Sequence, residues 1–384
     1  MNFDFSDDQN AIRELALQIF ADRATDEFLL QFSRSDDTYD EDLWRTLAQQ
    51  GLLGVAVPED VGGSGLGLIE LCLVLEEQGR HVAPVPLFAT LVLGGLPIAA
   101  FGSEEQRQRY LAPMAAGDRK LSAAIAEAGM NPAVVTQVSA RRDGDGWILS
   151  GSRQVVPDGA AADCVLVPAV EDDGRQTVFI VDTAAPGVSV TPVSFGLSGE
   201  RAAHLTLDNV RAGADTVLGE PGGGARIVAW LLERANVGHC ALQVGVTEEA
   251  MARTAAYVSE REQFGVPLGT FQALAMRMAD SYIDVEAIRS TYWLALWRLS
   301  EGRDVRAEVR AAKWWACDAA HRIVSTAQHL HGGMGADVEY PIHRFFLLAK
   351  QISYGLGNAS QQLEQLGRLL AEDDTLGFRA LELE

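Results

Sequence analysis

One long stretch of the chain, residues 225–262, has the character of a single helix. Its sequence is ARIVAWLLERANVGHCALQVGVTEEAMARTAAYVSERE, with apolar residues along its whole length. At about 1.5 Å of rise per residue, such a helix measures roughly 50 to 60 Å. Three further helical segments follow, at 270–301, at 307–330 and from 340 onward. Because four long helices in succession are typical of a bundle, the sequence predicts a C-terminal four-helix bundle.

The residues before this helix divide into a helical part and a β part. Ser6 is the expected N-cap of a first helix, in which Ile12, Leu15 and Ile19 recur at helical spacing. Runs with alternating character, such as WILSGSRQVV, TVFIVDT and HLTLDNVRA, follow from about residue 121 and indicate an antiparallel sheet. We therefore predict an α+β multidomain chain: an N-terminal helical domain (1–120), a central antiparallel β domain (121–220) and the bundle (221–384).

Composition excludes several classes of partner. The formal net charge of -22 disfavours nucleic acid and negatively charged membranes, since both are bound through clustered lysine and arginine. The first residues lack the basic and apolar regions of a signal peptide, and no apolar run approaches the roughly 20 residues of a membrane span. Four cysteines lie far apart without a disulfide pattern: Cys72, Cys164, Cys240 and Cys317. We expect a cytoplasmic protein.

The stretch HLHGGMG, residues 329–335, permits three interpretations. A metal site would need further ligands, and on a helix His329 and His331 point about 200° apart, so we predict no metal. Gly332 and Gly333 could simply end the preceding helix. The third interpretation is that these glycines expose backbone to a ligand, as phosphate-binding loops do.

A second stretch, YVSEREQFGVPLGTFQ, favours the ligand interpretation. Arg261 is a fixed cation of the kind used on pyrophosphate, and Phe264 offers an aromatic face. Gln272 offers both a donor and an acceptor near the start of the next helix, for which Thr270 is the expected cap. Each of these residues alone is more commonly structural.

Together, the two stretches resemble the acyl-CoA dehydrogenase family. The shared patterns are R-x-x-F-G-x-P with Gln eleven positions after the Arg, and H-G-G-x-G-x-x-x-x-Y-P-x-H-R, and the likeness extends over essentially the whole chain. The resemblance implies a homotetramer or heterotetramer that binds FAD across a subunit boundary, oxidises an acyl-CoA at its α and β carbons, and passes electrons to an electron-transferring flavoprotein. It also implies which residues contact FAD: Arg261, Phe264, Gln272, His329, Gly332 and Gly333.

This oxidation needs a carboxylate base, and the usual position lacks one. In most members a Glu-Gly-Thr tripeptide supplies the base, and it falls here on Leu356, Gly357 and Asn358. A subset takes the base from the long helix, immediately before an arginine, and that position is Glu233, followed by Arg234. Apolar neighbours would raise the pKa of Glu233. The alternative is that both residues form a solvent-exposed local pair.

A second departure concerns the flavin ring. The family contacts the ring with a Thr-Glu-Pro-x-Ala-Gly-Ser-Asp stretch and a Trp-Ile-Thr segment, whereas this chain has AEAGMNPAVV at 126–135, Val155 and Pro157.

We predict a FAD-dependent acyl-CoA dehydrogenase of fatty acid or sterol degradation. The alternative is a catalytically incomplete subunit that completes the FAD site of an unlike chain, as in some sterol-degrading members. A third reading is a scaffold that binds acyl-CoA without catalysis.

Overall fold

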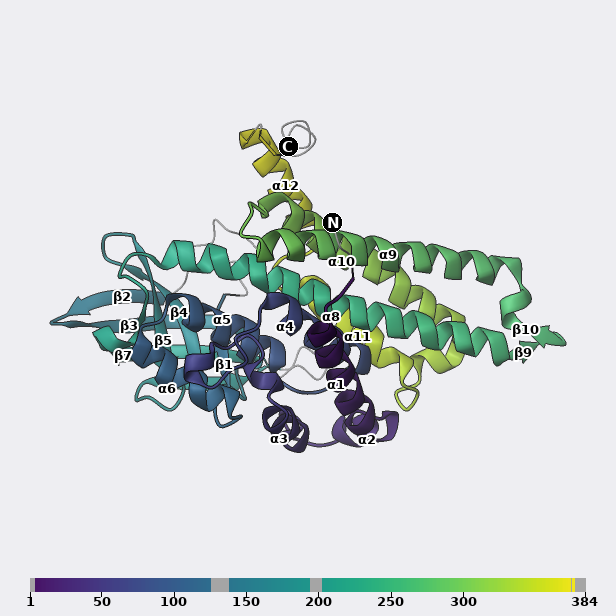
Figure 1. The fold of residues 1–384 in the computed structure, drawn as a ribbon, viewed down its shortest axis with the longest axis horizontal. Coiled ribbons are helices and arrows are strands. Elements are labelled where there is room, and N and C mark those ends of the chain that lie inside the picture. The colour runs from purple at the N-terminus through teal and green to yellow at the C-terminus, as the bar shows by residue number, and fades with distance from the viewer. Residues whose placement is uncertain (1–3, 126–137, 194–201, 374, 377–384) are drawn as a thin grey trace. The chain divides into compact units, whose positions relative to one another are not determined.

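The computed structural model describes residues 4–125, 138–193, 202–373 and 375–376. It forms two compact units. The first comprises Met1–Ile12, Ser35–Leu71 and Pro84–Ala235, and the second comprises Arg13–Arg34, Cys72–Ala83 and Asn236–Glu384. Three helices begin in the first unit and continue into the second: α1 (Asp7–Arg23), α4 (Leu68–His81) and α8 (Gly224–Glu260) (Figure 1). The expected capping of α1 is confirmed, because the Gln9 amide donates to the Ser6 hydroxyl at 3.2 Å.

An 8-stranded sheet forms most of the first unit's core, with the order β6-β7-β3-β2-β4-β5-β8 and β1 beside β4. The strands are β1 (Leu121–Ala123), β2 (Val138–Asp143), β3 (Gly146–Val156), β4 (Cys164–Glu171), β5 (Gln176–Asp182), β6 (Val188–Pro192), β7 (Ala203–Ala212) and β8 (Val217–Leu218). Pairing is antiparallel, as predicted, except that β4 runs parallel to β1 and β2. Trp147 and Phe179 meet edge to face at 5.4 Å in the buried layer.

Short helices complete the first unit. They are α3 (Glu41–Gln49), a π-helical segment (Phe88–Gly95), α5 (Leu96–Phe101) and α6 (Glu104–Ala115). Ser103 and Gln106 form a capping box at the start of α6. The Gln106 side chain also donates to the carbonyls of Asp215 and Val217, both at 2.8 Å. One buried amide therefore joins a helix start to the sheet edge.

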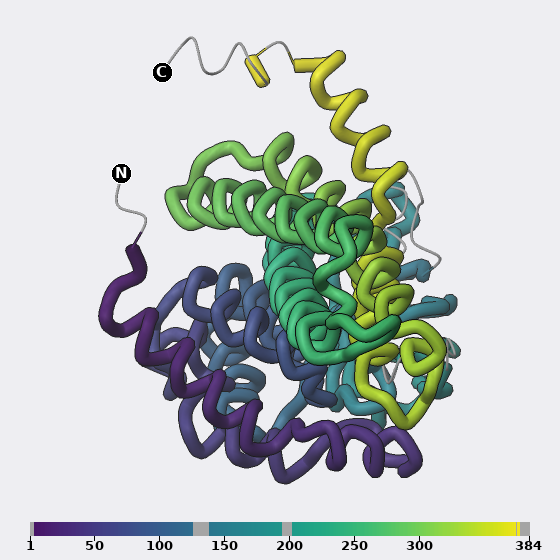
Figure 2. Tube along the Cα trace, turned by 90° about the vertical axis from the view of Figure 1, so that its right-hand side faces the viewer, coloured from purple at the N-terminus to yellow at the C-terminus, as the bar shows by residue number. Residues whose placement is uncertain are grey.

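The second unit is helical, as predicted for the bundle. It holds α2 (Asp26–Phe32), most of α8, α9 (Gln272–Ser300), α10 (Arg306–Leu330), α11 (Ile342–Tyr354) and α12 (Ala359–Glu372). Helix α10 packs against α9, α11 and α12 (Figure 2). The last helix is broken, whereas the sequence predicted one segment. Leu356 and Gly357 have positive φ, and Asn358 caps α12. Within the described residues, no helix is long and apolar enough to cross a membrane.

Helices α4 and α8 touch through backbone in the second unit. A Cβ built on Gly245 would lie 1.9 Å from the Glu76 carbonyl oxygen, and one on Gly79 would lie 2.1 Å from the Leu242 carbonyl oxygen. Both distances are far below van der Waals contact, so no other residue type fits either position without movement. The two glycines fix how closely these helices approach.

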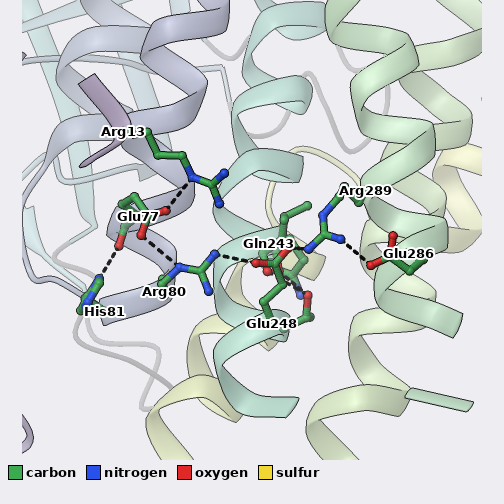
Figure 3. Close-up of polar contacts among 10 residues, drawn as sticks. Arg13, Glu77, Arg80, His81, Gln243, Glu248, Glu286 and Arg289 are labelled. Carbon is green, nitrogen blue, oxygen red and sulfur yellow. Dashed lines mark hydrogen bonds and ion pairs between the residues drawn. The ribbon is translucent and has the colours of Figure 1, made fainter. Parts of the chain in front are cut away.

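Side chains of alternating charge form a chain of ion pairs between these helices and their neighbours (Figure 3). Its members, from α1 to α9, are Arg13, Glu77, Arg80, Glu248, Arg289 and Glu286. Arg80 is central: its Nε donates to Glu77 at 3.0 Å and its Nη2 to Glu248 at 2.5 Å. Glu77 lies between Arg13 and Arg80, and Glu248 lies between Arg80 and Arg289, which offsets the cost of burying these two carboxylates.

A further carboxyl in this region belongs to Glu76, and no cation among the described residues lies within ion-pair distance of it. Its side chain is 3% exposed, and burial raises its pKa to about 8, with Arg13 and the Tyr292 hydroxyl opposing the shift. The Tyr292 hydroxyl is itself fully buried beside Glu76 and Cys72. At neutral pH the folded chain therefore carries Glu76 as the neutral acid.

We expect Gly245→Ala to destabilise the fold by about 3 kcal/mol, because its Cβ would overlap backbone that cannot move aside. Gly367→Ala is the matched control. Gly367 lies in α12 with no atom within 4 Å of a built Cβ, so alanine should stabilise by about 1 kcal/mol through helix propensity. Urea unfolding of both variants measures the two effects. Equal effects would contradict the backbone contact.

We expect Glu76→Gln to flatten the pH dependence of stability. The folded chain keeps this proton up to a pH near 8 and the unfolded chain releases it near 4.5, so the unfolded state binds fewer protons between these values. Stability of the native chain therefore falls as pH rises through that window, by on the order of 3 kcal/mol, and glutamine removes this fall. Urea midpoints at pH 5 and pH 8 test it, with Glu364→Gln on α12 as the control.

Candidate functional site

Three of the predicted contact residues gather where α8 turns into α9. After Glu260 the chain forms a small hairpin of β9 (Glu262–Gln263) and β10 (Val266–Pro267). Phe264 occupies its turn with φ of 57° and a side chain that is 92% exposed, edge-on to Phe271 at 6.2 Å. Arg261 precedes the hairpin, and Gln272 begins α9 directly after Phe271. All three side chains are exposed at this end of the second unit.

The expected cap of α9 was wrong. Phe271 is the N-cap residue, and it makes no side-chain cap hydrogen bond. The Thr270 hydroxyl instead donates to the Pro267 carbonyl at 2.7 Å, because Leu268–Thr270 forms a separate 3₁₀ turn. This leaves the first amides of α9 without a side-chain cap.

The two histidines of the glycine stretch have different environments. His329 is exposed on α10, whereas His331 is 3% exposed and stacks on Tyr257 with ring centroids 4.3 Å apart. Its Nδ1 donates to the Ala327 carbonyl at 2.8 Å, and burial lowers its pKa, so the ring is neutral. Among the described residues, no cluster of three or more histidine, cysteine or acidic side chains is suited to a metal ion.

The stack on Tyr257 also joins the two contact segments. Tyr257 lies one turn before Arg261, whose backbone amide donates to the Tyr257 carbonyl at 2.8 Å. His331 directly precedes Gly332, so the ring pair holds the start of the glycine stretch against the last turn of α8. The sequence analysis did not predict this role of His331, although it singled out His331 and the two glycines that follow it.

The geometry of this end fits the adenosine and pyrophosphate half of a dinucleotide. Gly332 has φ of 61°, and a Cβ on either Gly332 or Gly333 would meet nothing within 4 Å, so their backbone is open to a ligand. In the part of the chain that the structure describes, no carboxylate pairs with Arg261. An available guanidinium, open backbone and an exposed aromatic ring are the groups that hold phosphate and a base.

The first unit shows what stands at the positions predicted for the flavin ring. Val155 and Pro157 lie at the end of β3, and neither offers a side-chain donor. The Ser122 hydroxyl on β1 donates to the Pro157 carbonyl at 2.5 Å and is therefore already engaged. The stretch AEAGMNPAVV lies outside the described residues. Val155 and Pro157 therefore offer fewer contacts to a flavin ring than Arg261, Phe264 and the open glycines offer to adenosine and pyrophosphate.

Leu356, at the usual base position, is firmly held. Its side chain is 2% exposed, its φ is 59°, and the Gln362 amide donates to its carbonyl at 3.0 Å. The end of α11 before it is fixed by Lys313, whose ammonium is fully buried and donates to the Ile352 carbonyl at 2.7 Å. Lys313 also contacts His239 Nδ1 at 3.1 Å. A buried apolar side chain therefore occupies the position at which the family resemblance places the glutamate base.

Glu233 and Arg234 lie together in the α8 segment of the first unit. Arg234 Nη1 is 3.7 Å from Glu233 Oε2, and the two side chains are 17% and 27% exposed. Arg234 Nη1 also donates to the Trp230 carbonyl at 3.0 Å, and its guanidinium carbon lies 3.7 Å from the centre of the Trp230 ring. Burial lowers the pKa of Arg234 to about 10, opposed by Glu233. Glu233 is thus partly exposed and has a cation beside it.

Comparison with known proteins covers nearly the whole chain. The models for the N-terminal, middle and C-terminal domains of acyl-CoA dehydrogenases match residues 6–118, 123–210 and 222–371. Acyl-CoA dehydrogenase FadE27 of Mycobacterium tuberculosis is 38% identical over 91% of this chain and 93% of its own. A variant of the Tcur3481-Tcur3483 steroid ACAD is 46% identical, with a TM-score of 0.87 over 95% of this chain and 98% of that one. The ChsE4-ChsE5 complex from Mycobacterium tuberculosis contains a chain 36% identical, with a TM-score of 0.90 over 97% and 100%.

Proposed function

The chain belongs to the acyl-CoA dehydrogenase family, and we propose on that premise that Glu233 is the base with which it oxidises an acyl-CoA thioester. The family's enzymes are FAD-dependent oxidoreductases. The observation that carries this assignment is the position of Glu233, a carboxylate 3.7 Å from a guanidinium, set against Leu356 at the usual base position. In the described part of the chain, Leu356 leaves that position without a proton acceptor.

The proposed reaction removes two hydrogens from adjacent carbons. The bond between the α carbon and its hydrogen breaks, and the proton goes to a Glu233 carboxylate oxygen. Bound FAD supplies the acceptor for the hydride that leaves the β carbon. Arg234 stabilises the ionised form of Glu233 before proton transfer, because an adjacent positive charge favours a carboxylate. Partial burial keeps competing water away from the carboxylate.

We assign the FAD contacts to the second unit. Arg261 pairs with pyrophosphate, Phe264 lies against the adenosine end, and Gln272 hydrogen-bonds there. The backbone from His329 to Gly333 completes the cradle. Two observations support this assignment: the stack of His331 on Tyr257, which joins the two segments, and the exposure of the assigned residues, which are Arg261, Phe264, Gln272, His329, Gly332 and Gly333.

Glu233→Gln should lower the rate of flavin reduction by acyl-CoA about 10³-fold or more, because the amide cannot accept the α proton. The flavin should remain bound and the melting temperature nearly unchanged. Stopped-flow absorbance of the flavin under anaerobic conditions measures the rate. Glu364→Gln is the control for removal of one exposed carboxylate, and it should reduce flavin like the native enzyme. Native-like reduction by Glu233→Gln would place the base elsewhere.

A second candidate function is supported by the positions around the flavin ring. Leu356, Val155 and Pro157 all lack the groups that the family uses there, and two similar structures are named as pairs of chains. In this candidate the chain contributes the Arg261 and Gly332–Gly333 contacts to FAD held with an unlike dehydrogenase chain.

We infer a steroid acyl-CoA as the substrate class from the same neighbours, with an electron-transferring flavoprotein as acceptor. Buried thiols at Cys72, Cys164, Cys240 and Cys317 support a cytoplasmic location.

Flavin content separates the two candidates. A self-sufficient enzyme, purified alone, should carry near one FAD per chain, bleach with acyl-CoA, and lose FAD in the Arg261→Gln variant through the missing pyrophosphate contact. Arg368→Gln, on the exposed face of α12, is the control and should keep its flavin. A colourless chain that gains flavin only with a co-purified partner supports the second candidate and contradicts the first. Absorbance at 450 nm after flavin extraction gives the count.

A further inference from the structure

Trp230 lies between two side chains of the first unit. Phe101, at the end of α5, meets the Trp230 ring edge to face, with centroids 5.1 Å apart and planes at 82°. Arg234, one helical turn after Trp230, covers the ring face with its guanidinium carbon 3.7 Å from the ring centre. The indole therefore has a rigid support on one side and a cation on the other.

Arg234 does not reach its position through the ion pair with Glu233 alone. Neighbouring residues on a helix point about 100° apart and do not face each other, so Glu233 and Arg234 meet only if the arginine bends. The 3.7 Å between Nη1 and Oε2 is longer than a hydrogen bond, whereas Nη1 lies 3.0 Å from the Trp230 carbonyl. Trp230 holds the bent side chain through both its ring and its carbonyl.

Water would otherwise attract this guanidinium. Arg234 is only 17% exposed, so its charge has little contact with water where it lies, and this burial lowers its pKa to about 10. A flexible arginine in that situation extends toward solvent unless a contact keeps it back. Stacking on an indole is the strongest of the aromatic contacts available to a cation.

We propose that Trp230 is a positioning residue that keeps the charge of Arg234 beside Glu233 and so sets the proton affinity of the base. This inference rests on the proposed function of Glu233. The indole touches neither substrate nor reacting atoms in this role. It acts by fixing where one positive charge lies.

A direct consequence concerns the pH at which the enzyme works. Without the indole face, the Arg234 guanidinium extends into water and Glu233 loses the positive charge that lies 3.7 Å from it. The carboxylate then takes up its proton at a higher pH, so the base is ionised only in more alkaline solution. The pH dependence of flavin reduction shifts upward by about one unit.

The test compares Trp230→Leu with Trp230→Phe in the assembled holoenzyme, together with any co-purified partner. The first readout is the pH profile of the flavin-reduction rate. The second is the rate at which phenylglyoxal modifies Arg234, followed by peptide mass spectrometry, and it needs no activity. We expect Trp230→Leu to raise the apparent pKa by about one unit and to speed modification several-fold, with Trp230→Phe between it and the native protein.

Trp297→Leu is the matched control, because Trp297 forms another arginine stack, with Arg303 at 4.8 Å. It should leave both readouts unchanged. An unshifted pH profile in Trp230→Leu, or unchanged Arg234 modification, overturns the proposal. If Trp230→Leu does not fold, the smaller change in Trp230→Phe decides in the same way. Failure of the proposed function is distinct, since it appears as flavin reduction by Glu233→Gln.

Discussion

The close backbone contact between α4 and α8 is the constraint on which the second unit depends. Because neither Gly79 nor Gly245 leaves room for a side chain, the two helices meet at one distance and one register. That register brings Arg80 of α4 within hydrogen-bond reach of Glu248 of α8. The alternating charges around the contact therefore follow from it. A wider spacing would remove the Arg80 contact from Glu248, which is 12% exposed and would then keep Arg289 alone.

The same helix, α8, carries residues of both proposed sites. Its first-unit segment carries Trp230, Glu233 and Arg234, and its last turn in the second unit carries Tyr257, against which His331 stacks. A long helix is suited to this because its backbone hydrogen bonds are internal, so side chains along it can be assigned to different tasks. Aromatic rings perform the positioning at both ends: an indole beside the arginine and a phenol beside the histidine.

Periodicity in the sequence was enough to predict the order of helices, sheet and bundle, since apolar spacing records which face of an element is buried. Local chemistry was predicted less well. Thr270 looked like a cap, but its hydroxyl is used by the preceding turn. The break after Tyr354 depends on Leu356 adopting positive φ, which its residue type disfavours and which the surrounding contacts of Gln362 impose. The Gly245 contact requires knowledge of which helices cross. By contrast, the four-residue spacing of Trp230 and Arg234 was readable in advance and was overlooked.

Two buried ionisable groups, Glu76 and Arg234, have opposite charge states in the fold: burial favours the neutral form of the glutamate, whereas the arginine stays charged. Among the described residues, Glu76 has no cation within ion-pair distance, so burial raises its pKa and favours the neutral acid beside the Tyr292 hydroxyl. Arg234 is also removed from water, yet an aromatic face and a neighbouring carboxylate keep it charged. A carboxyl in the core, such as Glu76, can be kept as the neutral acid, and its charge state then affects the stability of the fold. A group that must influence a proton transfer has to keep its charge near the reacting carboxylate, and that requires a contact that holds the side chain without neutralising it. Indole meets this requirement, because its quadrupole attracts a cation but carries no net charge.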